Sequence, residues 1–198
     1  MQKNSCRVTV LIKPEFCIVL ALTLLILPLR WVIAWLCASA FHELCHYAAL
    51  RLSGCKVFRI QVDLNGAVME TDILRCSREV LCAMAGPAGG FALLIVARWF
   101  PRLAICSCFQ ALYNLIPIFP LDGGRAVSCV LRKLFSDNKS WAIQNGIENA
   151  VLFAVLVLGL YASFVLKLGV IPLLFSGVLI FRNKKIKTSC KERLLRVK

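Results

Sequence analysis

The chain has 198 residues, of which 60 % are hydrophobic, and its formal net charge at pH 7 is +14. Soluble domains usually contain roughly 45–50 % apolar residues, so this composition argues against a soluble protein, and the length leaves no room for a second, soluble domain. In a soluble protein such a charge would suggest contacts with nucleic-acid phosphates. The distribution of the cations, described below, argues against that class of partner.

The apolar residues are concentrated in six blocks. These are Phe16–Leu29, Trp31–Leu52, Val80–Phe100, Leu103–Pro120, Ile147–Leu166 and Leu168–Phe181. A membrane-spanning helix needs about 20 mostly apolar residues; three blocks meet this, the fourth nearly does, and the first and last are short. We predict an all-α polytopic membrane protein with about six transmembrane helices, or four if the two short blocks are re-entrant or interfacial.

The N-terminal segment has a basic start and an apolar run, as a signal peptide does. No small-residue cleavage site follows it at Pro28, so we interpret it as a retained first span. The eleven cysteines include no CxxC pair, and several, among them Cys17, Cys37, Cys82, Cys106 and Cys108, lie within the predicted spans. We expect these thiols to act as small hydrophobic side chains rather than as disulfides.

Two alternating runs, Val57–Leu64 and Ala67–Leu74, flank Asn65-Gly66 between the second and third spans. An Asn-Gly pair between alternating runs is the strongest short-range signal for a β-hairpin. We therefore predict a small hairpin there, on the cytosolic side of the membrane.

Glycine and proline interrupt two of the spans. Ala85–Gly90, with the sequence AGPAGG, predicts either a close approach of helices or an unwound turn beside a cavity. Asn114–Arg125, with the sequence NLIPIFPLDGGR, predicts an irregular end to the fourth span, because each proline removes a backbone donor. Ala126–Leu134 is then expected to be a short interfacial helix and Ser136–Lys139 a polar loop.

Lysine and arginine are distributed unequally across the predicted membrane. With both termini in the cytosol, 20 of the 24 lie on the inner side, and Arg30, Arg98, Arg102 and Lys167 lie outside. The positive-inside rule predicts this asymmetry. The sequence thus predicts a multi-pass protein of a bacterial plasma membrane, with a basic cytosolic tail at residues 182–198 that contacts anionic lipids and with no nucleic-acid partner.

Both histidines of the chain lie in His42-Glu43-Leu44-Cys45-His46. Residues i and i+4 share a helix face, so both imidazoles can reach one metal ion, as in the HExxH motif of zinc proteases. A catalytic zinc ion usually has three protein ligands and one water, and Glu43 is the candidate general base. The alternative is a helix whose histidines are satisfied by neighbouring groups. An intramembrane position disfavours it, because uncompensated ionisable groups are costly there.

Asp122 is the candidate third ligand, because it alone among the ten acidic residues lies beside a span in a segment unwound by glycine and proline. The second and fourth spans run in the same direction, which brings both motifs to the cytosolic half of the bilayer. Asn114 is a candidate for binding substrate or an oxyanion, and is equally suited to stabilising the bent helix. We expect Glu148 to be interfacial and Arg125 to contact lipid phosphate.

Together, HELCH, AGP and NLIPIFPLDGGR resemble the motifs of the site-2 protease family of intramembrane zinc metalloproteases. The resemblance implies that His42, His46 and Asp122 bind one Zn²⁺ ion, that Glu43 is the base, and that the substrate is a membrane-associated protein. It covers roughly Trp31–Phe181 and looks most like the branch that processes sporulation sigma-factor precursors. Without that branch's C-terminal nucleotide-sensing domain, residues 1–198 are expected to form a single protease core domain.

We therefore expect a zinc metalloendopeptidase that cuts its substrate within or beside the membrane on the cytosolic side. The hairpin would offer an edge for pairing with an extended substrate segment. Two other functions fit the composition: a small transporter or channel, and an inactive zinc-binding membrane scaffold. Glu43 separates them, since a transporter has no need of a glutamate directly after the first histidine, whereas a protease does.

Overall fold

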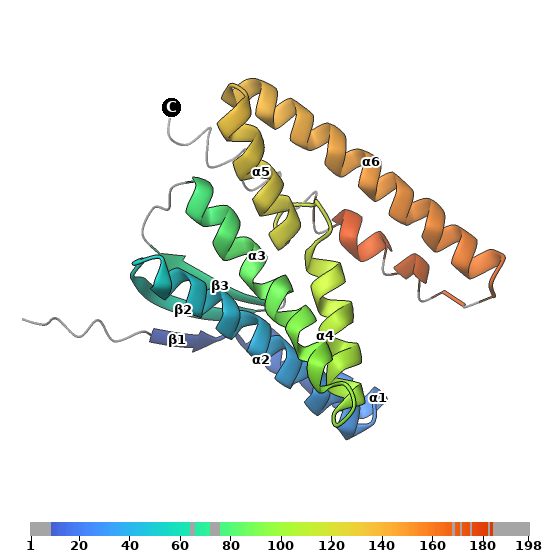
Figure 1. Ribbon diagram of the computed structural model, residues 1–198. Helices are drawn as coiled ribbons and strands as arrows, with labels where there is room; N and C mark the ends of the chain where they lie inside the picture. Colours follow the sequence, from blue (N-terminus) through green and yellow to red (C-terminus); the bar gives the residue numbers. More distant parts are fainter. Residues whose placement is uncertain are drawn as a thin grey trace, which may run out of the picture. The chain divides into compact units, whose positions relative to one another are not determined.

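A computed structural model describes residues 9–63, 66–71, 76–167, 169–170, 172–174, 176–181 and 183. The chain divides into two compact units, Met1–Leu115 and Ile116–Lys198, which are described separately below. Most described residues are helical, and the strands form one three-stranded sheet (Figure 1). The prediction of a mostly helical protein with a small hairpin is therefore confirmed.

The helices of the first unit are formed by apolar segments separated by prolines and polar residues. They are α1 (Pro14–Ile26), α2 (Leu29–Leu52), α3 (Cys76–Ala92), the 3-10 helix η1 (Leu93–Val96) and α4 (Pro101–Asn114). Pro14 and Pro101 each occupy the start of a helix, where the backbone N–H would have no intrahelical partner and the fixed φ suits the first turn. Helices α2, α3 and α4 pack against one another (Figure 1).

Small residues let α3 approach α4 closely. A Cβ atom added at Gly90 would lie 2.9 Å from the Cβ atom of Ala111. Ser107 on α4 also donates a hydrogen bond of 2.8 Å to the carbonyl oxygen of Gly90. The AGPAGG segment is continuous helix with Pro87 inside it. Of the two expectations for this segment, close helix approach is therefore correct, and the unwound turn is not.

The sheet of the first unit has the strand order β1-β2-β3. Strands β2 (Val57–Asp63) and β3 (Gly66–Thr71) are antiparallel, as the predicted hairpin requires. Residues 64 and 65, which include the asparagine of the predicted turn, and residues 72–74 lie outside the described residues. The sequence did not indicate β1 (Thr9–Ile12), which pairs in parallel with β2.

In the second unit, the short helix and the polar loop predicted after the glycine pair differ from expectation. Helix α5 (Asp122–Leu134) begins four residues earlier than predicted, and α6 (Asp137–Phe164) begins directly after Ser136. The predicted loop over Ser136–Lys139 is therefore wrong. Ser140 explains why, because its hydroxyl donates to the carbonyl oxygens of Leu131 (2.8 Å) and Phe135 (3.3 Å), where α5 ends. These polar residues complete helix ends instead of forming a loop.

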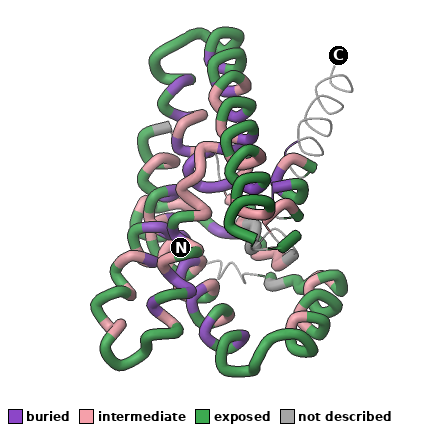
Figure 2. The backbone as a smooth tube through the Cα atoms, turned by 90° about the vertical axis from the view of Figure 1, so that its right-hand side faces the viewer, coloured by how far each residue is buried: buried purple, intermediate pink, exposed green. Residues whose placement is uncertain are grey.

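Within the residues that the structure describes, two helical segments are long and apolar enough to cross a membrane, Ser77–Val96 and Asp137–Phe164. Two shorter apolar helices, Pro14–Ile26 and Pro172–Phe181, fall below that length. Figure 2 shows long exposed stretches on the helices, and many large apolar side chains are among them, such as Leu25 (85 % exposed) and Ile95 (80 %). A bilayer would remove this surface from water. The six-span count remains a prediction.

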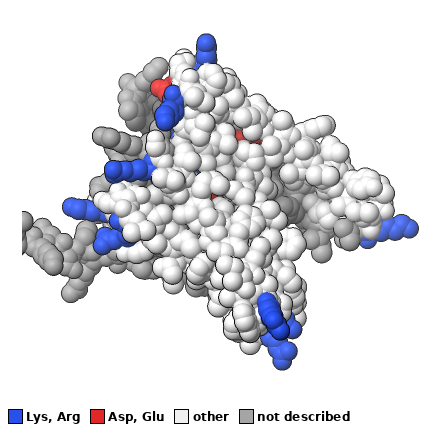
Figure 3. Space-filling model, viewed as in Figure 1, with Lys and Arg blue, Asp and Glu red and all other residues white. Residues whose placement is uncertain are grey.

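Figure 3 shows lysine and arginine side chains at separate places on this face, most of whose surface is neither acidic nor basic. In the first unit, Arg30 lies at the start of α2, and Arg51 lies at its end. Between these two residues, Glu43 is the one residue of α2 that is acidic or basic, apart from the histidines. Charged helix ends with an apolar middle are the pattern of membrane-spanning helices. Apart from Asn183, the predicted basic tail lies outside the described residues.

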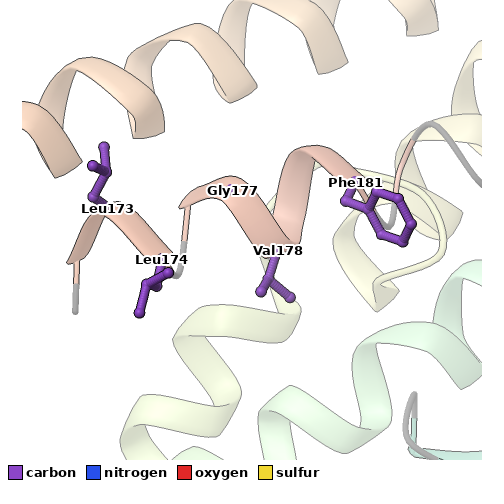
Figure 4. A pocket seen from close by; sticks show the side chains of 5 residues that line it. All are labelled: Leu173, Leu174, Gly177, Val178 and Phe181. Atoms are coloured by element: carbon purple, nitrogen blue, oxygen red, sulfur yellow. The ribbon is translucent and has the colours of Figure 1, made fainter. Parts of the chain in front are cut away.

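An apolar groove of 340 Å³ lies along the helix Pro172–Phe181 of the second unit. In Figure 4 the side chains of Leu174 and Val178 project to the same side of this helix. The lining residues are Leu173, Leu174, Gly177, Val178 and Phe181. None of their side chains is an acid, a base or a hydrogen-bond donor, so this groove is no candidate for catalysis.

Candidate metal centre

His42 and His46 lie on the buried face of α2 and meet at their Nε2 atoms. Their exposed fractions are 3 % and 9 %, and the two Nε2 atoms are 3.1 Å apart. Ala38, His42, His46 and Leu50, spaced at four residues, are all buried. The predicted pairing of residues i and i+4 on one helix face is therefore present.

The other ring nitrogen of His46 fixes the tautomer of this side chain. Its Nδ1 atom lies 2.7 Å from the carbonyl oxygen of Cys82 on α3. A carbonyl oxygen only accepts hydrogen bonds, so Nδ1 carries the hydrogen and Nε2 presents a lone pair. Metal-binding histidines are typically held in this way, with the second nitrogen bonded to a carbonyl or carboxylate.

Asn114, the last residue of α4, also reaches the histidine pair. Its side-chain Nδ2 atom lies 3.2 Å from Nε2 of His42. An amide nitrogen only donates, so this contact is compatible with a His42 whose Nε2 atom accepts. The two Nε2 atoms face the same point, and a neutral imidazole binds a metal ion through such an atom once it carries a free lone pair.

The spacing of the two nitrogens fits zinc. With Zn–N distances of about 2.0–2.1 Å, two ligand nitrogens of a tetrahedral site lie about 3.3 Å apart. The Nε2 atoms are 3.1 Å apart, which is close to this value. Two imidazole nitrogens facing an interior position therefore form half of a tetrahedral zinc site.

Gly86 makes room for this pair. A Cβ atom added there would overlap Nε2 of His46 and would lie 2.7 Å from Cε1 of His42. The AGP motif of α3 therefore packs directly onto the imidazole rings, and no larger residue fits at this position. Gly89, three residues along, packs against Cys45 in the same way, since an added Cβ atom would lie 3.0 Å from the Cβ atom of Cys45.

Glu43 follows His42 on α2 and is half-buried, as Cys45 also is. One residue corresponds to about 100° around a helix, so Glu43 leaves the helix in a different direction from the two histidines. This agrees with a residue that is not itself a ligand. Its assignment as the base remains a proposal, taken up below.

Asp122 belongs to the second unit, where it is the first residue of α5 and is 7 % exposed. A carboxylate is favoured there, because the N-terminus of a helix carries a partial positive charge. Oδ1 of Asp122 lies 4.0 Å from Nη1 of Arg125, one turn later. Arg125, which we expected to contact lipid phosphate, is therefore placed beside the predicted ligand.

Glu148 is buried, which overturns the prediction of an interfacial residue. It lies on α6 and is 1 % exposed, because α6 begins ten residues before the predicted span and this face turns toward the segment that precedes α5. Oε1 accepts hydrogen bonds from the backbone N–H of Phe119 (3.1 Å) and from Nε2 of Gln144 (3.0 Å). Oε2 accepts one from Nδ2 of Asn183, at 3.2 Å.

Three comparisons bear on these observations. No family model matches the chain. The chain is 29 % identical over 170 residues to a zinc metalloprotease, MJ0392, of Methanocaldococcus jannaschii, in an alignment that covers 74 % of this chain and 50 % of that protein. The chain thus spans about half the length of the curated relative that it matches. The structure is similar to that of a site-2 protease from the same organism, with a TM-score of 0.63, 25 % identity and coverage of 93 % of both chains.

The chain is similar in sequence to a zinc metalloprotease and in structure to a site-2 protease. The relatives' names, the histidine pair and the buried aspartate together support zinc as the metal of this chain. Two imidazoles and a carboxylate are a donor set that catalytic zinc commonly has. Both of these proteins come from Methanocaldococcus jannaschii, and neither tests the resemblance to the sporulation branch, which remains a prediction.

Sequence reasoning missed four contributors, two in each unit. Cys82 contributes its backbone carbonyl, and Gly86 contributes space because it has no side chain. A pattern of side chains in the sequence therefore does not identify either residue as a neighbour of the histidines. Gln144 and Glu148 did carry a signal. They stand four residues apart at the start of an apolar helix, the spacing at which polar side chains on one face meet.

Proposed function

We propose that this chain is a zinc-dependent intramembrane endopeptidase that hydrolyses a peptide bond of a membrane-associated protein. The observation that carries the proposal is the pair of buried Nε2 atoms of His42 and His46, 3.1 Å apart on one helix. Glu43, in the general-base position of HExxH, adds to it. The similarity to a zinc metalloprotease and to a site-2 protease gives independent support.

His42, His46 and Asp122 are the proposed ligands. All three side chains are buried, although each is of a type that normally prefers water. Burying an ionisable group is costly unless it is compensated, and a divalent cation compensates a carboxylate and two imidazole lone pairs together. Zinc supplies a Lewis acid and lowers the pKa of a water molecule to near neutrality.

Glu43 is the proposed general base. Its carboxylate takes a proton from the attacking water, whose oxygen forms the new bond to the carbonyl carbon of the substrate. As the C–N bond breaks, Glu43 returns that proton to the departing amine nitrogen, so that no net proton is gained or lost at Glu43. Asn114, whose amide nitrogen lies 3.2 Å from Nε2 of His42, is the proposed donor of a hydrogen bond to the substrate carbonyl.

The proposed setting is the cytosolic half of a membrane crossed about six times, with both chain termini in the cytosol. The unequal distribution of 24 lysines and arginines supports this orientation. The basic tail would then lie against anionic lipids, and the hairpin β2–β3 would face the cytosol. Since a helix conceals its amide bonds, the substrate must present an extended segment, and the edge of β3 is a candidate for pairing with it.

Co-expression of the chain with candidate single-span proteins tests the proposal. A product fragment should appear with the wild-type chain and disappear with Glu43→Gln at equal expression. A fragment that forms equally with both would remove the assignment as a protease. Sigma-factor precursors belong among the candidates, because they test the predicted sporulation branch in the same experiment.

A further inference from the structure

A buried polar network occupies the second unit around Glu148. The carboxylate is 1 % exposed, and its neighbours Gln144 (9 %) and Asn183 (3 %) are buried too. Ser128 extends the network, since its hydroxyl lies 2.8 Å from Oε1 of Gln144. Burying several polar side chains in an apolar helical unit costs free energy unless each of them is hydrogen-bonded. We therefore expect this network to have a structural or functional role.

The hydrogen bonds identify Glu148 as a pure acceptor. Nε2 of Gln144 also lies 3.3 Å from the carbonyl oxygen of Gly124, and Nδ2 of Asn183 lies 3.3 Å from that of Phe119. Because carbonyl oxygens cannot donate, both amide groups have their nitrogens correctly placed as donors. Each of the three groups described as bonded to Glu148 is thus an N–H donor. This arrangement suits the carboxylate anion.

These bonds converge on the segment that presents Asp122. Phe119 is held at both its N–H and its carbonyl group, three residues before Asp122. Gly124 is held at its carbonyl group, two residues after Asp122. Gly124 also packs so tightly on this segment that an added Cβ atom would lie 2.5 Å from the backbone nitrogen of Phe119. The segment is therefore fixed on both sides of Asp122 by side chains from elsewhere in the unit.

We propose that Glu148 is a positioning residue that fixes the segment Ile118–Gly124 and thereby sets the direction in which Asp122 presents its carboxylate. This inference rests on the proposed function in taking Asp122 as a zinc ligand. The backbone N–H of Leu121 donates to the carbonyl oxygen of Ile118 (2.9 Å), but Pro117 and Pro120 have no N–H and so cannot extend this turn into a helix. A buried anion with fixed donors is a strong substitute, because hydrogen bonds to a charged group are roughly twice as strong as neutral ones.

The test compares Glu148→Gln with the wild-type full chain in detergent. Glutamine keeps the shape but replaces one acceptor oxygen with an NH₂ group, which would face a donor. Zinc affinity, measured by competition with a chromogenic chelator, should fall by about 10-fold or more, the effect typical of residues that support a ligand. With cobalt(II) in place of zinc, the visible absorption bands should shift, since they report ligand geometry. Asn183→Ala, which removes one donor only, should change both readouts in the same direction by less.

Ser140→Ala is the matched control. Ser140 is also buried, on the same helix α6, but its hydroxyl bonds to Leu131 and Phe135 at the far end of α5. It should lower thermal stability and leave the zinc affinity and cobalt spectrum unchanged. If Ser140→Ala weakens zinc binding as much as Glu148→Gln does, the effect is general destabilisation and the positioning role is wrong.

Amide hydrogen exchange separates this inference from the proposed function. The N–H of Phe119 should exchange faster in Glu148→Gln than in the wild-type chain, with or without added zinc. Wild-type protein that binds no zinc would overturn the proposed metal site, and unchanged exchange at Phe119 would overturn the role of Glu148. Tight zinc binding in both wild type and Glu148→Gln would overturn the positioning role and leave the proposed function standing.

Discussion

Nε2 of His42 lies 3.1 Å from Nε2 of His46. The hydrogen of His46 is on Nδ1, where it is donated to the carbonyl of Cys82, and the amide nitrogen of Asn114 lies 3.2 Å from Nε2 of His42. A cation bound between the two Nε2 atoms would be coordinated by a lone pair from each imidazole.

Zinc content is the first measurable consequence. Purified protein should hold about one zinc ion per chain, and His42→Ala or His46→Ala should remove it, because each takes away one of three protein ligands. Metal analysis after dialysis gives the result. Cys45→Ala, in the same motif, is the control and should retain zinc, since this residue is not among the proposed ligands. Well-folded wild-type protein without zinc would contradict the site.

A second consequence concerns Gly86. Gly86→Ala should displace the His46 ring, because the added Cβ atom would lie 2.6 Å from its Cε1 atom. Zinc affinity should fall by about 10-fold or more, as it typically does when a residue that supports a metal ligand is removed. Gly146→Ala is the matched control, since nothing lies within 4 Å of a Cβ atom added there. It should leave zinc binding intact and raise stability slightly, by about 0.5–1 kcal/mol, because alanine favours a helix. Equal zinc affinity in both variants would show that Gly86 does not shape the site.

The sequence predicted the features that depend on residues close together in the chain. The histidine pair needs only a helix and a four-residue spacing, and the hairpin needs two alternating runs beside a turn pair. Close packing at Gly90 was one of two predicted alternatives, and only the partner residues Ala111 and Ser107, about 20 positions away, decide between them.

Features that depend on distant partners were missed. Strand β1 is four residues long and has no pattern of its own; it exists because Thr9 to Ile12 pair with Arg59 to Val62. The sequence predicts that Glu148 is interfacial, because a glutamate near the end of an apolar segment usually contacts water. Gln144, four residues away, is one of its donors, but the other two described, Phe119 and Asn183, are 29 and 35 residues away, and no local pattern reveals them.

Membrane orientation provides a third prediction. Reporter fusions after Lys198 and at Ser136 should read as cytosolic, and a fusion near Arg102 should read as external, as the charge asymmetry requires. A reporter that is active on only one side of the membrane shows on which side each position lies. An external C-terminus would overturn both the predicted topology and the placement of the site on the cytosolic side.

The fourth prediction separates the base from the ligands. Glu43→Gln should leave zinc bound, because Glu43 is not a proposed ligand, but it removes the proton acceptor. General-base catalysis is typically worth about 10²–10⁴-fold, so cleavage of a tethered substrate should slow by at least that range. Asp122→Asn should instead weaken zinc binding together with cleavage, since a neutral amide is a poorer ligand than a carboxylate.

The pattern across the two variants distinguishes the three candidate functions. If the chain is a protease, both variants lose cleavage, whereas only Asp122→Asn also loses zinc. A transporter would show flux that follows zinc occupancy and would form no product fragment, so Glu43→Gln would have little effect on it. An inactive scaffold would bind zinc and cleave nothing even as wild type. Cleavage rate and zinc content are therefore measured on the same preparations, and a wild-type rate in Glu43→Gln would show that Glu43 is not the base.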